Sequence, residues 1–528
     1  MKKVWKGLAA AASAAAIAAT GFVGASSAYA EDVSLDVSGK KNITLNGVAA
    51  GDTYEAYKLL NVTGATAVKD SDPVEVSSVA YTIVPEYKNI LKTALGLTGD
   101  VTDKQIIDGI SNINTIKWET PDGTVEEDRE VVLGSDSIYV REFAKSVMDA
   151  INAYNAGKPD TEKLKPADTK TVAKGDSSVT FQLDAGYYLF NQTKNAKPDT
   201  NTDSSYIINT AVVADRTIQV KNGTVTLTKK VKDNEAPNFT ADQKWNDSAD
   251  YNIGDTVPFQ LTGTLPANFE SFKTFKYAFH DVASKGLTVD FDSIKVYAIN
   301  GTTKEEITDS FRVSSTLSTG ETSFTVDIED LKSINTEDKV IITKDTTIVV
   351  EYNAVLNSNA VIGEAGNPNE ATIEFSNNST HDGDGDTEFT PTDKVTVFTY
   401  QLNIIKTFST GAPADNDLPK FTLYKKDGSG KYQEYTNDKE TKAEKVVQKV
   451  EEKNEDGTVK STSYVINWEG LDAGDYKLVE THVPGGYVKA DDIEFNIRAT
   501  HDVNSDDPKL TKLESNFPQG KTASLLAL

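Results

Sequence analysis

Alternation of apolar and polar residues at every second position is the feature that most constrains how this chain can fold. Residues i, i+2 and i+4 of a strand point to one face of a sheet, so this pattern is typical of half-buried strands. Between about Gly223 and Pro391 it recurs in short runs separated by turn-forming residues, which predicts a β-sandwich. The apolar faces are carried by Val225, Leu227 and Val231, by Phe275, Tyr277 and Phe279, and by Ala371, Ile373 and Phe375.

The part of the chain before this sandwich has a mixed pattern. Phe143, Val147, Ile151 and Tyr154 recur at helical spacing. The pattern therefore predicts an α+β domain, or a β domain decorated with helices. Strands are expected at residues 43–46, 54–60, 178–183 and 187–190, and helices at 87–97 and 140–154.

The part after the sandwich contains a strand-like stretch, Leu471–Tyr487, in which Tyr476, Leu478 and Glu480 share one face. Leu183–Thr193 repeats its first half and has Gln192 where Glu480 falls, which indicates two weakly similar domains. A Lys/Glu-rich insertion at residues 438–454 is expected to be a solvated helix or hairpin.

The amino terminus has the pattern of a secretory signal peptide, with Met1-Lys-Lys followed by an Ala-rich apolar run and Ala28-Tyr-Ala30. We expect the signal peptide at residues 1–30 and domains at 31–222, 223–391 and 392–528.

The formal net charge of −26 makes nucleic acid and anionic membranes unfavourable partners. Cysteine is absent, so any covalent staple must be something other than a disulfide.

Four ionisable residues fall on the apolar faces of strands: Lys229, Asp281, Lys406 and Glu480. In one interpretation these residues lie at sheet edges and extend their charged ends into water, or they form buried ion pairs. The other is a chemical cross-link, because burial lowers the pKa of a lysine and raises that of an acid. A neutral amine can attack an asparagine carboxamide beside a neutral acid, and ammonia leaves. Each domain then needs an asparagine on a strand next to its lysine.

Several motifs resemble those of the backbone pilins of Gram-positive bacteria. Tyr476-Lys-Leu-Val-Glu-Thr-His-Val-Pro-Gly-Gly-Tyr487 resembles their E-box, and residues 226–231, 251–259 and 281–288 resemble their middle domain. The resemblance implies a mainly β chain of three tandem Ig-like β-sandwich domains. The middle domain would be of the collagen-adhesin A type, the C-terminal domain of the B type, and the first would carry helical insertions. It also implies a shaft subunit of a covalently polymerised cell-wall pilus, with autocatalytic Lys–Asn isopeptide bonds and no enzymatic activity beyond their formation.

The resemblance also assigns residues. It implies a bond from Lys229 to Asn369 with Asp281 as the acid, although Asn377 shares the same parity. Asn369 is favoured because it precedes its strand. A second bond would join Lys406 to Asn516 with Glu480 as the acid. The first domain has Gln192 in place of the acid, so no bond is expected there.

Polymerisation would need a pilin-specific class C sortase, further copies of the chain, and tip and basal pilins as partners. Ile218-Gln-Val-Lys221-Asn222 stands where such pilins carry Val-Tyr-Pro-Lys-Asn. Lys221 is therefore the expected acceptor, or else an ordinary surface lysine. A sorting signal of the Leu-Pro-x-Thr-Gly type is expected beyond Leu528.

Other sites have less support in the sequence. No cofactor is expected, and four His without Cys provide little material for zinc. Asp382-Gly-Asp-Gly-Asp386 suits a solvated turn better than a calcium loop, because an EF-hand needs a Gly at position six and a Glu at position twelve. A monomeric wall-associated adhesin and a secreted carbohydrate-active enzyme are the alternative functions.

Overall fold

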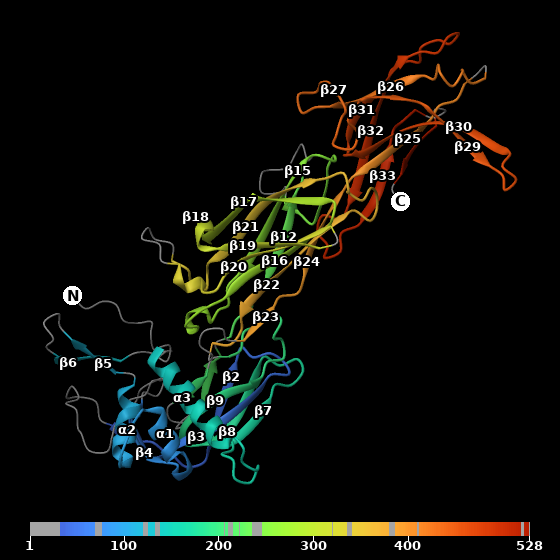
Figure 1. Cartoon of the computed structure of the whole chain (residues 1–528). Coiled ribbons are helices and arrows are strands. Elements are labelled where there is room, and N and C mark those ends of the chain that lie inside the picture. The colour runs from blue at the N-terminus through green and yellow to red at the C-terminus, as the bar shows by residue number, and fades with distance from the viewer. Residues whose placement is uncertain are drawn as a thin grey trace. The chain divides into compact units, whose positions relative to one another are not determined.

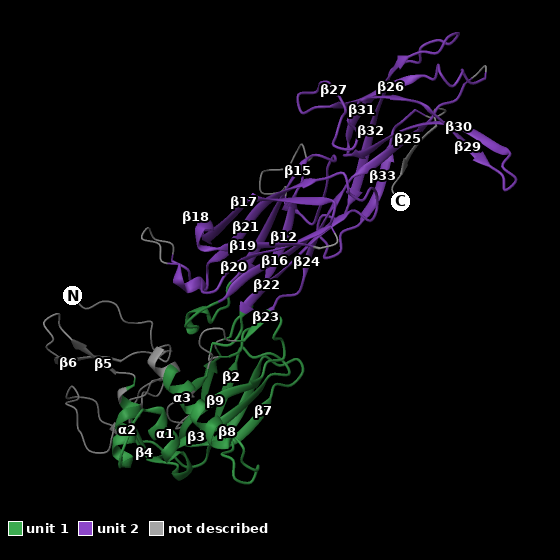
Figure 2. Ribbon diagram, in the orientation of Figure 1, with its two compact units in different colours: residues 1–225, 265–275, 376–388 green, residues 226–264, 276–375, 389–528 purple. Residues whose placement is uncertain are grey.

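The computed structural model describes residues 32–68, 76–113, 115–119, 125–132, 138–204, 206–209, 215–220, 222–234, 245–318, 320–334, 341–379, 386–408, 411–518 and 522–526. The chain divides into two compact units, which Figure 2 shows in different colours. Unit 1 comprises residues 1–225, 265–275 and 376–388, and unit 2 comprises residues 226–264, 276–375 and 389–528. No helix among the described residues is long and apolar enough to cross a membrane.

Unit 1 combines strands with the three α-helices of the described residues (Figure 1). One sheet has the order β1-β3-β9-β10 with β4 and β7 also paired to β3, a second has the order β11-β2-β8, and β5 pairs with β6. The elements are β1 (Asp32–Ser34), β2 (Lys40–Asn46), β3 (Thr53–Val68), β4 (Val76–Ile83), α1 (Lys88–Ala94), α2 (Asp103–Asn112), β5 (Thr115–Glu119), β6 (Val125–Val132), α3 (Ile138–Asn155), β7 (Asp168–Thr171), β8 (Ser178–Asp184), β9 (Gly186–Lys194), β10 (Ile207–Asn209) and β11 (Arg216–Gln219).

Each α-helix of unit 1 buries an apolar face, and α2 also begins with a cap. Phe143, Val147 and Ile151 of α3 are buried in one core, whereas Tyr154 near the end of the helix is 42% exposed. Helix α2 begins with a capping box in which Thr102 accepts a hydrogen bond from the Gln105 backbone N–H. The strands and the two helices expected in this part of the chain are confirmed, and α2 is an addition.

The first part of unit 2 is a sandwich of two sheets, in which most neighbouring strands run antiparallel. One has the order β13-β12-β15-β21-β17-β18, and the other contains the path β14-β24-β22-β16-β20-β19. Rings from both sheets meet in the core, where Phe324 of β20 contacts Tyr352 of β21 edge-to-face. The strands are β12 (Leu227–Lys232), β13 (Trp245–Asn246), β14 (Ser248–Asp250), β15 (Thr256–Thr264), β16 (Tyr277–Ala283), β17 (Leu287–Asn300), β18 (Thr303–Glu306), β19 (Arg312–Ser318), β20 (Glu321–Ile328), β21 (Thr347–Leu356), β22 (Asn367–Ser376), β23 (Thr387–Phe389) and β24 (Asp393–Phe398).

The second part of unit 2 also consists of two sheets, with the orders β29-β30-β25-β34 and β27-β26-β31-β32-β33, and β28 pairs with β26. The insertion at residues 438–454 forms β28, which pairs with β26, and β29, which forms a hairpin with the following strand β30. The helix alternative is not formed, and the hairpin extends beyond the insertion. The strands are β25 (Tyr400–Ile405), β26 (Lys420–Lys426), β27 (Tyr432–Glu434), β28 (Glu444–Val446), β29 (Gln448–Lys453), β30 (Val459–Leu471), β31 (Gly474–His482), β32 (Ile493–His501), β33 (Leu510–Ser515) and β34 (Thr522–Leu526). The expected fold class, mainly β with helices in the first part, is confirmed.

The internal repeat in the sequence corresponds to a repeated local structure. Strands β9 and β31 both begin with a glycine and carry a buried tyrosine two residues later. The Tyr188 hydroxyl donates to the Asp184 carbonyl at 2.9 Å, and the Tyr476 hydroxyl donates to the Asp472 carbonyl at 2.7 Å. The same hydrogen bond therefore fixes the start of the strand in both units.

Candidate functional site: a buried lysine, acid and amide

Lys229 lies on the core-facing side of β12. Its neighbour on β15 is Leu261, and Val231 on the same face is completely buried. The alternation of the strand therefore places the lysine in an apolar core, and its side chain has no solvent exposure. Lys230, of opposite parity, is 25% exposed and pairs with Asp247. Strand parity alone therefore separates the two lysines.

Asp281 and Asn369 reach the same core from the opposite sheet. Asp281 lies opposite Ala371, and Ala283 lies opposite Asn369, so the two polar residues are diagonal neighbours on one face of β16 and β22. Asp281 is 1% exposed and Asn369 is 0% exposed. The pairing of β16 with β22 thus brings an acid and a carboxamide beside the lysine of β12.

The contacts among these side chains converge on the Tyr352 hydroxyl from β21. The Lys229 Nζ donates to the Asp281 Oδ2, and it also donates to the Tyr352 hydroxyl at 3.1 Å. The Tyr352 hydroxyl donates to the Asp281 Oδ2 at 2.8 Å. It accepts from the Asn369 Nδ2 at 2.7 Å. The nucleophile, the acid and the amide that the sequence singled out therefore lie in one connected cluster.

The apolar surroundings favour the uncharged forms of the lysine and the acid. Removal from water lowers the pKa of Lys229, and this effect outweighs the opposing influence of Asp281. Burial likewise raises the pKa of Asp281 against the attraction of Lys229. The Lys229 amine lies 5.7 Å from the centre of the Phe259 ring. A neutral amine beside a neutral acid is the state that nucleophilic attack on an amide requires.

Two oxygen atoms in the cluster are available to share a proton. Among the described residues, the Asp281 Oδ1 and the Asn369 Oδ1 are buried and have no hydrogen-bond partner. Buried polar atoms are normally paired, so two unsatisfied acceptors in one cluster call for an explanation. A proton on Asp281 would let this carboxyl donate to the Asn369 carbonyl and polarise it toward attack.

Asn377 shares the parity of Asn369 but lies past the other end of β22. Its backbone N–H donates to the Asp386 carbonyl at 3.0 Å. The structure therefore links Asn369 to Lys229 through the Tyr352 hydroxyl and leaves Asn377 outside the cluster. Asn369 lies within β22, so the expectation that it precedes its strand is wrong.

The second predicted cluster is partly assembled. The Lys406 Nζ lies 3.8 Å from the Glu480 Oε1, with side-chain exposures of 25% and 2%. Lys406 follows the last residue of β25, which explains why it is less buried than Lys229. The Glu480 Oε2 accepts from the Ala490 backbone N–H. Lysine and acid are thus together at the edge of this core.

Asn516 does not join that pair. Its side chain is exposed, and its Oδ1 accepts from the Asn496 backbone N–H at 2.7 Å. Asn496 pairs with Asp475, which precedes Glu480 by five residues on β31. At about 3.3 Å per residue, this places Asn516 roughly 16 Å from the level of Glu480 along the sheet.

The other positions singled out in the sequence are Gln192, Lys221 and the candidate calcium turn. Gln192, at the position equivalent to Glu480, accepts from the Ser204 backbone N–H at 2.6 Å and so has a structural hydrogen bond. Lys221 and residues 382–385 of the candidate calcium turn lie outside the described residues. Among the described residues, no group of three or more His, Cys, Asp or Glu could hold a metal ion.

Tyr352 is the member of this cluster that the sequence reasoning missed. A signal for it exists, because it occupies a buried position in the alternating strand β21. A tyrosine in such a position needs a partner for its hydroxyl.

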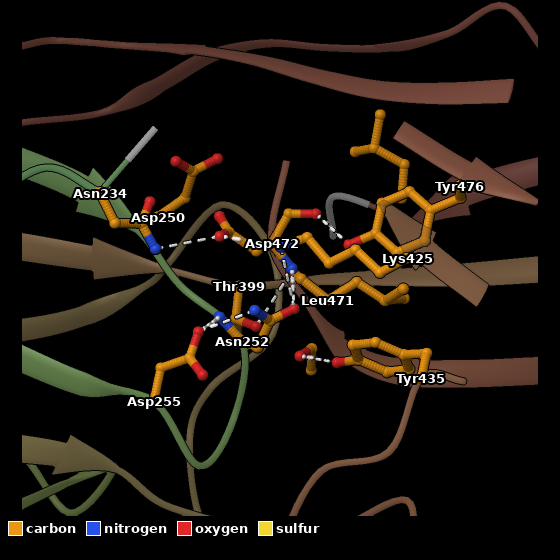
Figure 3. A network of polar contacts seen from close by, with 12 residues as sticks. Asn234, Asp250, Asn252, Asp255, Thr399, Lys425, Tyr435, Leu471, Asp472 and Tyr476 are labelled. Carbon is orange, nitrogen blue, oxygen red and sulfur yellow. Dashed lines mark hydrogen bonds and ion pairs between the residues drawn. The ribbon is translucent and has the colours of Figure 1, made fainter. Parts of the chain in front are cut away.

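A second polar network connects the two sandwiches within unit 2 (Figure 3). The Lys425 Nζ lies 3.1 Å from the Oδ2 of Asp472, which is 1% exposed. The Asn234 Nδ2 donates to the same oxygen at 3.2 Å, and the Asn252 Oδ1 accepts from the Asp472 backbone N–H at 3.2 Å. Asn252 also donates to Asp255 at 2.7 Å. Asp255 is therefore a turn residue, and the network holds the junction of the two sandwiches.

Replacing Lys425 with alanine should destabilise unit 2 by about 3 kcal/mol, because the buried Asp472 loses its charged partner. Urea denaturation of the full chain measures the change. Lys439→Ala is the matched control, since its ion pair with Glu469 is more exposed and should be worth at most about 1 kcal/mol. Equal effects of the two variants would contradict a structural role for this network.

Comparison with known proteins assigns a fold to part of the chain and gives a set of similar structures. The family model of the SpaA prealbumin-like fold domain matches residues 414–509. The chain is similar to the T6 backbone pilin of serotype M6 Streptococcus pyogenes, with 17% identity over 93% of this chain and 95% of that chain and a TM-score of 0.47.

Two further solved structures are similar in the same way. The major pilin SpaA of Corynebacterium diphtheriae is 14% identical over 88% of this chain and 98% of that chain, with a TM-score of 0.42. The major pilin subunit BcpA of Bacillus cereus is 14% identical over 87% of this chain and 95% of that chain, with a TM-score of 0.38. No match was found among curated proteins.

Proposed function

We propose that this chain is the shaft subunit of a covalently polymerised cell-surface pilus, and that its middle sandwich is stapled by a self-formed isopeptide bond between Lys229 and Asn369. The observation that carries the proposal is the buried cluster in which Lys229, Asp281 and Asn369 are linked through one hydroxyl. The pilin motifs of the sequence support the wider assignment.

The proposed bond forms by exchange of one amide for another. The neutral Lys229 amine attacks the Asn369 Cγ, and protonated Asp281 polarises the carbonyl. The bond from Cγ to Nδ2 then breaks, one hydrogen passes from the lysine nitrogen to the departing nitrogen, and ammonia leaves. The products are one amide and one ammonia, so no oxidant or co-reactant is needed. Folding supplies the orientation, because both groups are fixed in the same core.

For the last domain we retain the sequence-based proposal of a Lys406–Asn516 bond assisted by Glu480. The lysine and acid already lie 3.8 Å apart. This bond requires Asn516 to leave the Asn496 backbone and move toward Lys406.

Polymerisation itself would join copies of the chain through Lys221, by the action of a pilin-specific class C sortase, on a secreted protein attached to the cell wall. Tip and basal pilins would be further partners. The support lies in the signal-peptide pattern at residues 1–30 and the partial acceptor motif Ile218-Gln-Val-Lys221-Asn222.

In the native host, Lys221→Ala should abolish the ladder of high-mass polymers, because the chain then has no acceptor amine for the next subunit. Immunoblotting of detergent-boiled cell-wall extracts measures the ladder. Lys197→Ala, an exposed lysine in the same unit, is the control and should leave the ladder intact. A ladder that persists in Lys221→Ala would show that another lysine is the acceptor.

A further inference from the structure

The Tyr352 hydroxyl lies between the nitrogen that would attack and the nitrogen that would leave. It is within hydrogen-bond distance of the Lys229 Nζ at 3.1 Å and of the Asn369 Nδ2 at 2.7 Å. We propose that Tyr352 is a catalytic residue of bond formation, whose hydroxyl delivers the proton that converts the departing Asn369 nitrogen to ammonia. This proposal rests on the proposed Lys229–Asn369 bond.

All of the hydrogen bonds that the structure gives the Tyr352 hydroxyl are made to members of this cluster. It accepts hydrogen bonds from the lysine and the amide and donates its one hydrogen to the Asp281 Oδ2 at 2.8 Å. One donor and two lone pairs are all that a phenol offers, so each has a partner that takes part in the reaction.

The ring of Tyr352 is held in a fixed position. It stacks on Phe259 with the centroids 5.3 Å apart and an interplanar angle of 18°. Phe324 packs against it edge-to-face at 5.2 Å and 81°. Tyr352 is 2% exposed, so the hydroxyl has no solvent-facing alternative. Rings packed on two sides keep the oxygen where both nitrogens can reach it.

A proton donor at this place meets a chemical need. An amide nitrogen is a poor leaving group until it is protonated, and its lone pair becomes basic only after Cγ turns tetrahedral. Lys229, Asp281 and Asn369 are at most 1% exposed, so bulk water does not reach the leaving nitrogen. Among the contacts of the described residues, the Tyr352 hydroxyl is the group that touches the Asn369 Nδ2.

The proton balance closes within the cluster. As the Lys229 Nζ bonds to Cγ, protonated Asp281 gives its proton to the Asn369 oxygen, and the resulting carboxylate takes a hydrogen from the Lys229 nitrogen, its contact at Oδ2. Asp281 then passes a proton to the Tyr352 oxygen. The original phenol hydrogen, which points at the Asp281 Oδ2 in the structure, turns toward the Asn369 Nδ2 and transfers to it. The C–N bond breaks with its electron pair on nitrogen, and the Asn369 oxygen returns its proton to Asp281 as the carbonyl re-forms. Ammonia departs, and Tyr352 and Asp281 recover their starting protonation.

The experiment follows the rate of cross-linking in the full chain. Protein is made by cell-free synthesis, samples are denatured at intervals, and mass spectrometry of digests gives the fraction of peptide that links Lys229 to Asn369. Tyr352→Phe keeps the ring and removes the hydroxyl. We expect the bond to form at least about 100-fold more slowly, the effect typical of losing a general acid.

Tyr277→Phe is the matched control. Tyr277 is completely buried in the same sandwich, and its hydroxyl donates to the Thr264 carbonyl at 2.9 Å, away from the cluster. This variant should cross-link at the wild-type rate. Circular dichroism of both variants verifies that each has folded.

The possible outcomes separate this inference from the proposed function. Wild-type protein that yields no linked peptide overturns the cross-link itself. Linked wild-type protein together with a Tyr352→Phe variant that links equally fast overturns the role of Tyr352 and leaves the bond intact. Equal slowing in Tyr352→Phe and Tyr277→Phe would assign the effect to a lost buried hydrogen bond in general, and would also overturn the role of Tyr352.

Discussion

Purified Asp281→Ala protein is expected to retain one ammonia that the wild-type protein has lost. In the proposed reaction Asp281 supplies the proton that polarises the Asn369 carbonyl, and its removal would leave Lys229 beside an unactivated amide. Intact-protein mass spectrometry, corrected for the substitution, measures the difference. The peptide linking Lys229 to Asn369 should be present in digests of the wild type and absent from those of the variant.

Asp327→Ala is the control for this prediction. Asp327 is a buried carboxylate on β20, next to the strand of Asp281, and it pairs with Arg312 at 2.7 Å. Its removal disturbs the same sheet without touching Lys229, so this variant should lose ammonia as the wild type does. A wild-type protein of full calculated mass would contradict the assignment. A second missing ammonia that Glu480→Ala restores would support the bond from Lys406 to Asn516.

Asn369→Ala is expected to lower the free energy of unfolding of the middle sandwich by about 4–5 kcal/mol, because the cross-link no longer closes the long loop between residues 229 and 369 in the unfolded chain. This substitution is more informative than loss of the lysine or the acid, since the contact between Lys229 and Asp281 remains. Loss of either partner of that buried pair would add a destabilisation of its own.

Urea denaturation, followed by limited proteolysis across residues 226–398, measures the change for this sandwich. Asn377→Ala provides the comparison, because Asn377 is 6% exposed and follows the same strand at its other end. Without a cross-link to lose, it should be destabilised by about 1 kcal/mol. The assignment would be wrong if Asn369→Ala unfolded at the same urea concentration as the wild type.

The sequence predicted those parts of the site that depend on strand parity. Lys229, Asp281 and Asn369 each interrupt an alternating apolar row, and alternation determines which face of a strand a side chain occupies. Tyr352 was missed because it also fits an alternating row. It shares a sheet with Lys229, but its meeting with Asp281 and Asn369 depends on how two sheets face each other. That relation is a property of tertiary packing.

The position of Asn516 shows the same limit in another form. Parity does not determine register between β32 and β33, and the structure pairs Asn516 with the Asn496 backbone at a distance from Glu480.

Helix α2 was missed for a different reason, since the Thr102–Gln105 capping box was readable in the sequence. The network of Lys425 and Asp472 joins residues far apart in the chain, and sequence spacing gives no sign of it.

Lys229 lies on the first strand of its sandwich, and Asn369 lies on β22, the neighbour of the closing strand β24. With a bond between them, the middle of the chain becomes a closed ring with two tails. A pulling force that enters at one tail leaves by the other through the new amide, so the residues within the ring cannot be drawn out. A protease that cuts once inside the ring opens it without separating the two tails, so a filament of the proposed kind would keep its continuity.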